Sequence, residues 1–327
     1  MTSTPNPAIS PLALIADDMR AVDRVIAQRL TTSVPLIGQI SHYIIAAGGK
    51  RLRPALLLLV CGALGYEGAQ RFNLAAVVEL IHTATLLHDD VVDESTMRRG
   101  RATANESFGN PASVLVGDFL HTRSFQMMVE AGSMRIMEIL SEATNVIAEG
   151  EVQQLINMHD ASLDEAGYLR VIRSKTAKLF EASAQLGAIL AGSPPAIEAA
   201  CATYGQALGT AFQIIDDVLD YDGDTAEMGK NIGDDLREGK STLPLIAAMQ
   251  RGTPEQAATV RHAIEQGSTE SLEKIVAIVK ETGALEVARA AAHAEAQRAI
   301  TALACIPSNI YSASLLQLAA QLLARRT

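Results

Sequence analysis

Aromatic residues and cysteines are scarce in this sequence. Only 4% of its 327 residues are aromatic and none is tryptophan, whereas alanine, leucine, isoleucine, glutamate, glutamine and methionine dominate. Such a mixture favours helices over strands, so the sequence predicts an all-α protein. The cysteines, at positions 61, 201 and 305, form an odd number without metal-ligand spacing. This pattern argues against a disulfide framework and is typical of the reducing cytoplasm, where we expect the protein to work.

A basic excess and a long apolar run are also missing. Acidic residues outnumber basic ones by 37 to 27, which gives a formal net charge of −10. No global basic field can hold a nucleic acid, so a phosphate-bearing ligand must be bound locally. The longest apolar run, residues 55–66, is shorter than the roughly 18 residues that span a bilayer. Because residues 1–11 lack a positive charge, we expect neither a signal peptide nor a transmembrane anchor.

Helical periodicity extends through nearly the whole chain after a proline-marked tail, residues 1–10. No linker or short repeat divides the chain, so we expect a single-domain helical bundle over residues 1–327. Residues 222–241, rich in glycine and charge, are predicted to form a long functional loop. The expected helices are residues 12–31, 35–47, a helix with Pro54 in its first turn, 72–94, 111–130, 133–159, 163–190, 197–221, 242–250 and further helices to the C-terminus.

Two acidic motifs, DDVVD (89–93) and DDVLD (216–220), lie within apolar helical stretches. The first and last aspartates of each motif share a helix face, where their like charges repel. One such motif alone can be a solvated acidic patch. Two copies, both flanked by apolar residues, indicate instead hard oxygen ligands on facing helices. Magnesium with substrate phosphates suits such ligands.

Basic residues near these motifs predict phosphate binding. GGKRLRP (48–54) places three cations at the start of a helix, where an anion would offset their unfavourable position. RRGR (98–101) follows the first acidic motif, and arginine binds phosphate bidentately. A solvated basic loop and an ordinary helix C-terminus are the respective alternatives. His82 lies on the helix face of Asp89, and Gln213 lies three residues before Asp216. The remaining candidates are Lys175, Thr176, Lys230 and Lys240.

These segments together resemble the trans-type polyprenyl diphosphate synthases, and are most similar to the bacterial octaprenyl diphosphate synthases that make the ubiquinone side chain. The similarity covers nearly the whole chain after the first thirty residues. The motifs that support it are GGKRLRP (48–54), LLHDDVVDES (86–95), RRG (98–100), GDFL (117–120), KTAKLFE (175–181), FQIIDDVLDYDGD (212–224) and GKNIGDDLREGKSTLP (229–244), with the longer stretches GDFLHTRSFQMM (117–128) and IAEGEVQQLIN (147–157).

The resemblance implies repeated condensation of isopentenyl diphosphate onto an allylic diphosphate, with farnesyl diphosphate as primer. It implies three Mg²⁺ ions, two at Asp89 and Asp93 and one at Asp216, while Asp90, Asp217 and Asp220 complete the metal set and shape the site. It also implies a homodimer, with transient membrane contact during product release. The implied ligands of the allylic diphosphate are Arg98, Lys175 and Lys230, with Thr176 and Gln213 at its reactive end, and those of isopentenyl diphosphate are Lys50, Arg53, His82 and Arg99.

Product length is predicted from the helix before Asp89. A tail anchored at the first acidic motif must pass Thr85, Ala84, Ile81, Val78 and Leu74, and no aromatic residue blocks that face. From Asp89 back to Asn73 the helix spans ~24 Å, enough for about four or five isoprene units before the tail must bend. A product longer than farnesyl is expected, whereas eight units follow from the resemblance alone.

Three alternatives remain at this point. A terpene cyclase could share the fold, although it would have little use for the second diphosphate site around Lys50, Arg53 and Arg99. An inactive regulatory subunit of a heteromeric synthase would not need two complete acidic motifs. A synthase of another product length is the third alternative. Consumption of isopentenyl diphosphate by the purified chain alone separates the first two from an active synthase.

Overall fold

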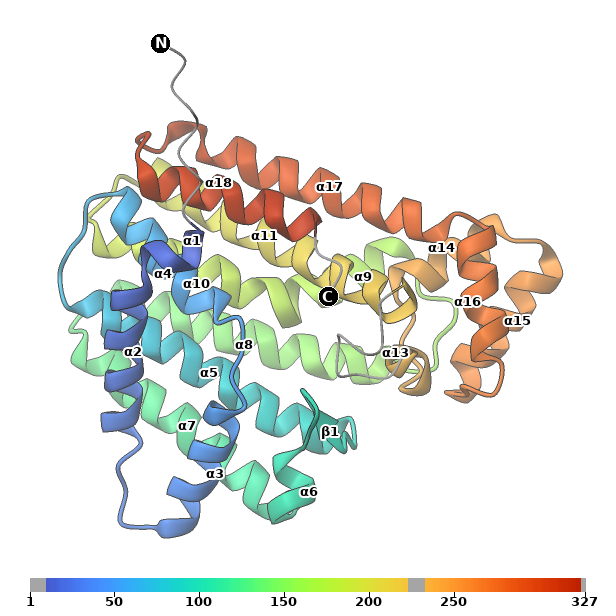
Figure 1. The fold of residues 1–327 in the computed structure, drawn as a ribbon, viewed down its shortest axis with the longest axis horizontal. Helices are drawn as coiled ribbons and strands as arrows, with labels where there is room; N and C mark the ends of the chain where they lie inside the picture. Colours follow the sequence, from blue (N-terminus) through green and yellow to red (C-terminus); the bar gives the residue numbers. More distant parts are fainter. Residues whose placement is uncertain (1–9, 223–232, 325–327) are drawn as a thin grey trace.

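The computed structural model describes residues 10–222 and 233–324, and most of these residues are helical (Figure 1). The predicted all-α, single-domain bundle is confirmed, and one continuous hydrophobic core joins the helices. Apart from Ser10, the predicted tail lies outside the described residues. In chain order the first elements are α1 (Pro11–Leu14), α2 (Ala16–Arg29), α3 (Pro35–Ala46), α4 (Leu52–Ala63), α5 (Gln70–Val92), β1 (Met97–Arg98), β2 (Arg101–Ala102), α6 (Ala104–Phe108), α7 (Asn110–Glu130) and α8 (Met134–Asn157).

The second half of the chain continues the bundle. It consists of α9 (Glu165–Ile172), the π-helical turn η1 (Arg173–Ala177), α10 (Lys178–Leu190), α11 (Pro195–Asp222), α13 (Asp234–Arg237), α14 (Leu243–Arg251), α15 (Pro254–Gln266), α16 (Leu272–Glu281), α17 (Ala284–Ala302), the 3₁₀ turn η2 (Leu303–Cys305) and α18 (Ile310–Leu323). Several of these helices begin at local signals: Pro35 opens α3, and Thr253 exchanges hydrogen bonds with Gln256 in a capping box before α15.

Helix α11 runs through the middle of the molecule, packed against α10 on one side and α17 on the other (Figure 1). The close approach to α10 and η1 depends on small residues. A Cβ atom at Gly209 would lie 2.7 Å from the Cα atom of Ala177, closer than real contacts allow. Glycine at this position therefore lets α11 and η1 lie backbone to backbone.

Replacing Gly209 with alanine should lower the free energy of unfolding by about 1–3 kcal/mol, because the added methyl group collides with a neighbouring backbone. Gly38, in α3, is the matched control, since an added Cβ there meets no atom within 4 Å. Gly38→Ala should leave the stability unchanged or raise it by up to about 1 kcal/mol, because alanine suits a helix interior better than glycine. Urea unfolding of both variants measures the difference, and equal changes would contradict the close packing.

Three local features differ from the sequence-based prediction. The first predicted helix is divided at Ile15 into α1 and α2, and the helix predicted over residues 163–190 is interrupted by η1. The RRGR segment forms the turn of the β1–β2 hairpin rather than a helix end, and Arg99 and Gly100 adopt φ angles of 51° and 72°. Positive φ at both central positions is typical of a two-residue hairpin turn.

The segment predicted as one long loop, residues 222–241, is partly helical in its described residues, 222 and 233–241. Helix α11 extends to Asp222, and α13 forms a short helix after Gly233, whose φ is 80°. Helix α13 is fixed to α11 because the carboxylate of Asp220 accepts hydrogen bonds from the backbone amides of Asp234 and Asp235. Asp234 and Asp235 are therefore held against the second acidic motif.

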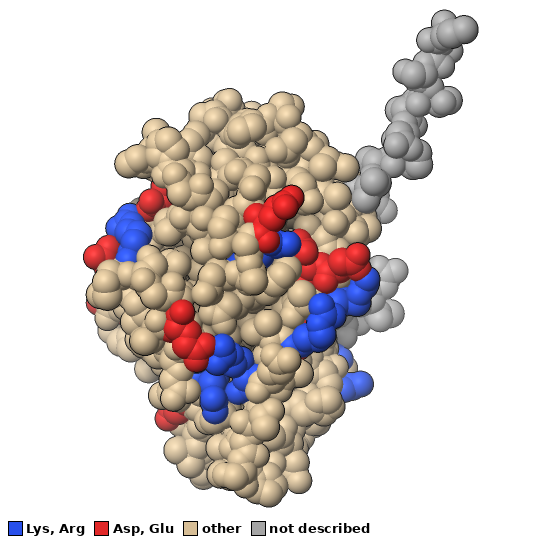
Figure 2. Space-filling model, turned by 90° about the vertical axis from the view of Figure 1, so that its left-hand side faces the viewer, with Lys and Arg blue, Asp and Glu red and all other residues tan. Residues whose placement is uncertain are grey.

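The described surface carries both basic and acidic side chains, as the sequence predicts (Figure 2). Figure 2 shows one side of the molecule, where Lys and Arg side chains lie in small groups beside Asp and Glu, and much of the described surface is uncharged. Among the described helices, none is both long enough and apolar enough to cross a bilayer.

Candidate active site

The first acidic motif lies at the C-terminal end of α5. Asp90 is fully buried and paired with Arg98, whose Nη2 and Nε atoms lie 2.7 and 3.0 Å from its Oδ1 atom. This pair fixes the β1–β2 hairpin against the end of α5. Asp89 is half-buried, and burial together with the neighbouring Asp93 carboxylate raises its pKa, while Lys175 opposes the shift.

The second acidic motif lies in the last two turns of α11. Asp217 is buried and accepts hydrogen bonds from Tyr168 and Gln213, at 2.6 and 2.7 Å. Burial and the nearby Asp235 carboxylate raise the pKa of Asp217 well above its usual value, and the two hydrogen bonds act in the opposite direction. Burial and Asp235 also raise the pKa of Asp220 to about 8. This end of α11 thus concentrates acidic side chains whose charged forms burial and mutual repulsion disfavour.

The π-helical turn η1 lies between the two motifs. Its Lys175 ammonium group is 3.8 Å from Oδ2 of Asp89 and 2.6 Å from Oε2 of Glu151 in α8, while Thr176 donates to Gln213 in α11 at 2.9 Å. One turn of helix therefore contacts both α5 and α11. π-Helical turns are rare and frequently occur at functional sites, because they displace side chains from regular helical positions.

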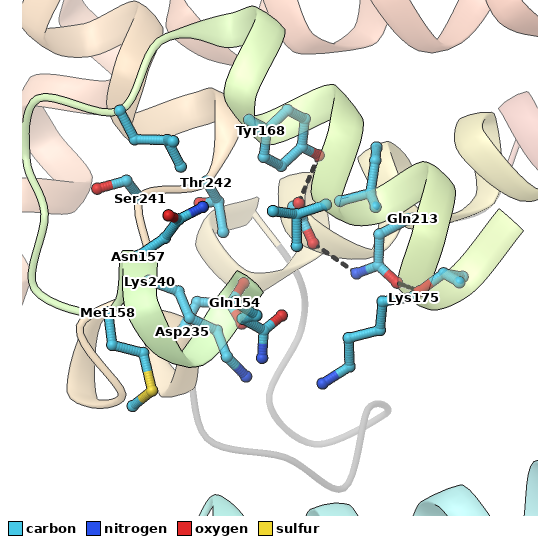
Figure 3. Close-up of a pocket in the computed structure, with 15 residues that line it drawn as sticks. Gln154, Asn157, Met158, Tyr168, Lys175, Gln213, Asp235, Lys240, Ser241 and Thr242 are labelled. Carbon is cyan, nitrogen blue, oxygen red and sulfur yellow. Dashed lines mark hydrogen bonds between the residues drawn. The ribbon is translucent and has the colours of Figure 1, made fainter. Parts of the chain in front are cut away.

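A second lysine approaches the first motif from the chain segment after α13. The ammonium group of Lys240 is 3.5 Å from Oδ2 of Asp93 and also pairs with Glu238. Lys175 and Lys240 thus offset part of the repulsion between the aspartates of the first motif. Beside them is a cavity of about 120 Å³ (Figure 3), whose lining includes Lys175, Thr176, Gln213, Asp217, Asp235 and Lys240.

The basic cluster at the start of α4 lies close to the middle of α5. The guanidinium group of Arg53 lies 4.6 Å from the centre of the Phe180 ring. Its Nε atom is buried and has no hydrogen-bond partner among the described residues, and burial lowers the pKa of Arg53 to about 10. Burial and the charges of Arg53, Arg98 and Arg99 lower the pKa of His82, which keeps the imidazole neutral. A buried, unpaired donor beside a neutral histidine suits an anionic ligand.

Arg99 joins this cluster across the hairpin. A Cβ atom at Gly49 would lie 2.5 Å from Nη1 of Arg99, so the absence of a side chain at Gly49 makes room for the guanidinium group. The hairpin is anchored from α3, where the Tyr43 hydroxyl donates to the carbonyl oxygen of Ala102 at 2.6 Å. The two basic segments found in the sequence therefore meet in space.

Most of the predicted site residues can be located, and several unpredicted residues lie among them. Lys50 is exposed just before α4, and Lys230 lies outside the described residues. Sequence reasoning missed four side chains that contact the predicted ones: Glu79, Glu151, Tyr168 and Glu238. Glu79 occurs three residues before His82, and Glu151 lies within the IAEGEVQQLIN stretch. Closeness in sequence to these segments is the one signal that could have identified the two glutamates as site residues.

The predicted chain-length residues lie along α5 behind the first motif. Ala84 and Ile81 are buried at 2% and 1% exposure, and Thr85 is half-buried with its hydroxyl bonded to the carbonyl oxygen of His82. Near the other end of α5, the side-chain amide of Asn73 donates to the carbonyl oxygen of Met127 in α7 at 3.1 Å. Helix α7 thus borders α5 at the distance where the predicted tail must bend.

The carboxylates fit a hard divalent cation bound with a diphosphate. Asp89, Asp93 and Asp216 could provide oxygen ligands, and a cation would oppose the rise in the pKa of Asp89 that burial and the Asp93 carboxylate cause. Among residues 10–222 and 233–324, no group of three or more carboxylate, histidine or cysteine side chains is arranged to hold a metal by itself. Mg²⁺ typically uses one or two carboxylates per ion and completes its shell with water and phosphate oxygens.

Comparisons with known proteins agree with this geometry. Over 307 residues the chain is 54% identical to the octaprenyl diphosphate synthase of Escherichia coli (strain K12), covering 94% of this chain and 95% of that protein. It is 46% identical over 310 residues to an all-trans-nonaprenyl-diphosphate synthase (geranyl-diphosphate specific) of Rhodobacter capsulatus, covering 94% of both.

The same relationship holds for solved structures. A polyprenyl synthase from Caulobacter crescentus CB15, complexed with calcium and isoprenyl diphosphate, superposes with a TM-score of 0.94 at 44% identity, covering 99% of this chain and 100% of that one. Residues 34–282 match the family described as polyprenyl synthetase, a span that includes both acidic motifs and the basic cluster. The chain therefore belongs to the polyprenyl synthetase family.

Proposed function

We propose that the protein is a magnesium-dependent trans-polyprenyl diphosphate synthase. It condenses isopentenyl diphosphate repeatedly onto farnesyl diphosphate and releases octaprenyl diphosphate for the ubiquinone side chain. The single observation that best supports this proposal is the position of η1, which contacts Asp89 in the first motif and Gln213 beside the second. Two acidic motifs joined in this way can act on one diphosphate group.

Three Mg²⁺ ions are proposed, two held by Asp89 and Asp93 and one by Asp216, each bound together with diphosphate. When bound, magnesium supplies Lewis acidity toward the charge that develops on the departing diphosphate. Asp90 and Asp217 act indirectly, because their buried carboxylates are committed to Arg98 and to Tyr168 and Gln213. Asp220 secures α13 through two backbone amides.

The basic residues divide between the two substrates. We propose that Arg98, Lys175 and Lys230 hold the allylic diphosphate. Thr176 and Gln213 lie at its reactive end. Isopentenyl diphosphate binds in the cluster around α4 and the hairpin, and its proposed ligands are Lys50, Arg53, His82 and Arg99. The lowered pKa values of Arg53 and His82 reflect burial that a bound diphosphate would compensate.

The reaction begins when the allylic C–O bond breaks and the diphosphate leaves with the bonding electrons. The double bond of isopentenyl diphosphate attacks the resulting carbocation and forms the new C–C bond. A proton is then lost from the adjacent carbon, and the released diphosphate accepts it. Lys240, held against Asp93, covers this side of the site and helps to exclude water from the cation.

Because the two substrates are assigned separate ligands, Arg53→Ala is predicted to change the KM of one substrate more than that of the other. The variant should raise the KM for isopentenyl diphosphate more than the KM for the allylic primer, because charge-assisted hydrogen bonds are removed from one substrate only. Steady-state kinetics with each substrate varied in turn measures both constants. Equal increases in both would reject the assignment of Arg53 to isopentenyl diphosphate.

A homodimer is proposed because α7 and α8 expose apolar side chains. These exposed residues are Leu115, Val129, Met134, Val152, Leu155 and Ile156. Such side chains are typical of a surface that a second subunit covers. We also propose a cytoplasmic enzyme, which the three free cysteines support, and transient membrane contact when the apolar product leaves.

The experiment that tests the proposed reaction uses the purified chain alone. With farnesyl diphosphate and Mg²⁺ it should consume isopentenyl diphosphate and release inorganic diphosphate, and EDTA should stop both. A cyclase would release diphosphate from the allylic substrate without consuming isopentenyl diphosphate. A regulatory subunit would do neither, and either result would reject the proposal.

A further inference from the structure

Tyr168, in α9, is a buried tyrosine outside every motif that the sequence revealed. Its side chain is 4% exposed, and its hydroxyl donates a hydrogen bond of 2.6 Å to Oδ2 of Asp217. Figure 3 shows Tyr168 and Gln213 with dashed lines for the hydrogen bonds that each makes. The tyrosine thus contacts the second acidic motif through its one polar atom, at the edge of the cavity that Lys175 and Gln213 also line.

The contact continues as a chain of hydrogen bonds. The Nε2 atom of Gln213 donates to Oδ1 of Asp217 at 2.7 Å, and the Thr176 hydroxyl donates to Oε1 of Gln213 at 2.9 Å. With its amide nitrogen turned toward Asp217, Gln213 leaves its side-chain oxygen to accept from Thr176. The hydrogen bonds therefore converge on Asp217, from Tyr168 in α9 on one side and from Thr176 in η1 through Gln213 on the other.

The residues at the two ends of this chain of hydrogen bonds indicate what it does in the site. Asp217 lies between Asp216 and Asp220 in sequence, so fixing its carboxylate fixes the rotation of the last turns of α11. Thr176 is next to Lys175, whose ammonium group lies 3.8 Å from Asp89. A buried carboxylate with both oxygens bonded has few other orientations, because turning would leave polar atoms unpaired.

We propose that Tyr168 is a positioning residue, which holds Asp217 and thereby sets the second acidic motif in register with Lys175 and the first motif. The inference rests on the proposed function, because these aspartates are the proposed holders of magnesium diphosphate. Tyr168 itself touches no substrate in this account. Partners that orient metal ligands from behind typically change metal affinity or activity by ~10–100-fold when removed.

The test compares Tyr168→Phe with Tyr204→Phe. Tyr204, in α11, is also fully buried, and its hydroxyl donates to the carbonyl oxygen of Leu315 at 2.7 Å, so each variant loses one buried hydroxyl and one hydrogen bond. Both should lower the melting temperature by similar small amounts. Only Tyr168→Phe should lower kcat by ~10–100-fold and weaken the binding of Mg²⁺ with inorganic diphosphate, measured by calorimetry. Its KM for isopentenyl diphosphate should stay near the wild-type value.

All comparisons are made at a temperature where the variants keep the wild-type circular dichroism spectrum. If Tyr168→Phe folds poorly at every temperature, Tyr168→Met replaces it, since methionine also lacks the hydroxyl and its flexible side chain adapts to a buried space. The proposal is overturned if the Tyr168 variant binds magnesium diphosphate and turns over as Tyr204→Phe does. A wild-type chain that binds magnesium diphosphate without condensing isopentenyl diphosphate contradicts the proposed function instead, and the calorimetry then decides the role of Tyr168 separately.

Discussion

Replacing Asp89 or Asp216 with alanine should lower turnover by at least ~10²-fold, the loss typical of removing one electrostatic stabiliser of a transition state. Each carboxylate is proposed to hold magnesium against the departing diphosphate. In Asp89→Ala, Lys175 would lose the carboxylate at 3.8 Å and retain only Glu151 as an ion-pair partner among the described residues. The measurement is kcat at saturating substrates over a range of Mg²⁺ concentrations.

A matched acidic control is Asp17, which is exposed on α2 and paired with Arg20. Asp17→Ala should leave kcat unchanged, because exposed ion pairs contribute little and this one lies outside the site. Calorimetry adds a second test, since wild-type protein should bind Mg²⁺ tightly only when inorganic diphosphate is present. Near-normal rates for both Asp89→Ala and Asp216→Ala at saturating Mg²⁺ would remove the basis of the proposed mechanism.

Introducing tyrosine at Ala84 or Thr85 should shorten the product to a short prenyl diphosphate. Either ring would stand about one helical turn, ~5.4 Å, behind Asp89, where a growing tail has to pass. The first condensation should continue largely intact, because the metal and diphosphate ligands are unchanged. Chromatography of the products after dephosphorylation measures their length.

Packing around Ala84 makes a stability control necessary. Ala84 is 2% exposed, so a tyrosine there displaces neighbours and should lower the melting temperature. Thr85 is half-buried and tolerates the change better, and Thr85→Val serves as the control that removes the hydroxyl without adding bulk. Thr85→Val should make the wild-type product. If folded tyrosine variants still release the wild-type chain length, the tail does not follow α5 and the account of length control is wrong.

The helices were predictable because their apolar positions recur with helical period. The candidate site residues were identifiable because charged motifs interrupt apolar stretches. Asp89 and Asp216 were identified in this way. The hairpin at Arg98 and the π-helical turn at Lys175 were missed, because both depend on contacts with distant segments. The hairpin residue Ala102 accepts a hydrogen bond from Tyr43 in α3, and η1 is held close to α11 at Gly209.

The positioning residues could not be predicted for a related reason. Tyr168 and Glu151 occur in ordinary amphipathic helices, where one tyrosine or glutamate carries no distinctive spacing. Their importance appears only when α8, α9 and α11 meet around Lys175 and Asp217. Residue type therefore indicated the proposed substrate ligands, whereas tertiary packing determines which side chains contact those residues from other helices.

The most direct test of the central claim is the product made by the purified chain from labelled isopentenyl diphosphate, farnesyl diphosphate and Mg²⁺. After dephosphorylation, reverse-phase chromatography with mass detection gives the number of isoprene units. The account predicts an all-trans product of eight units, formed by successive additions through intermediates of increasing length. A chain that incorporates no label under these conditions, or that stops after a single addition, would contradict it.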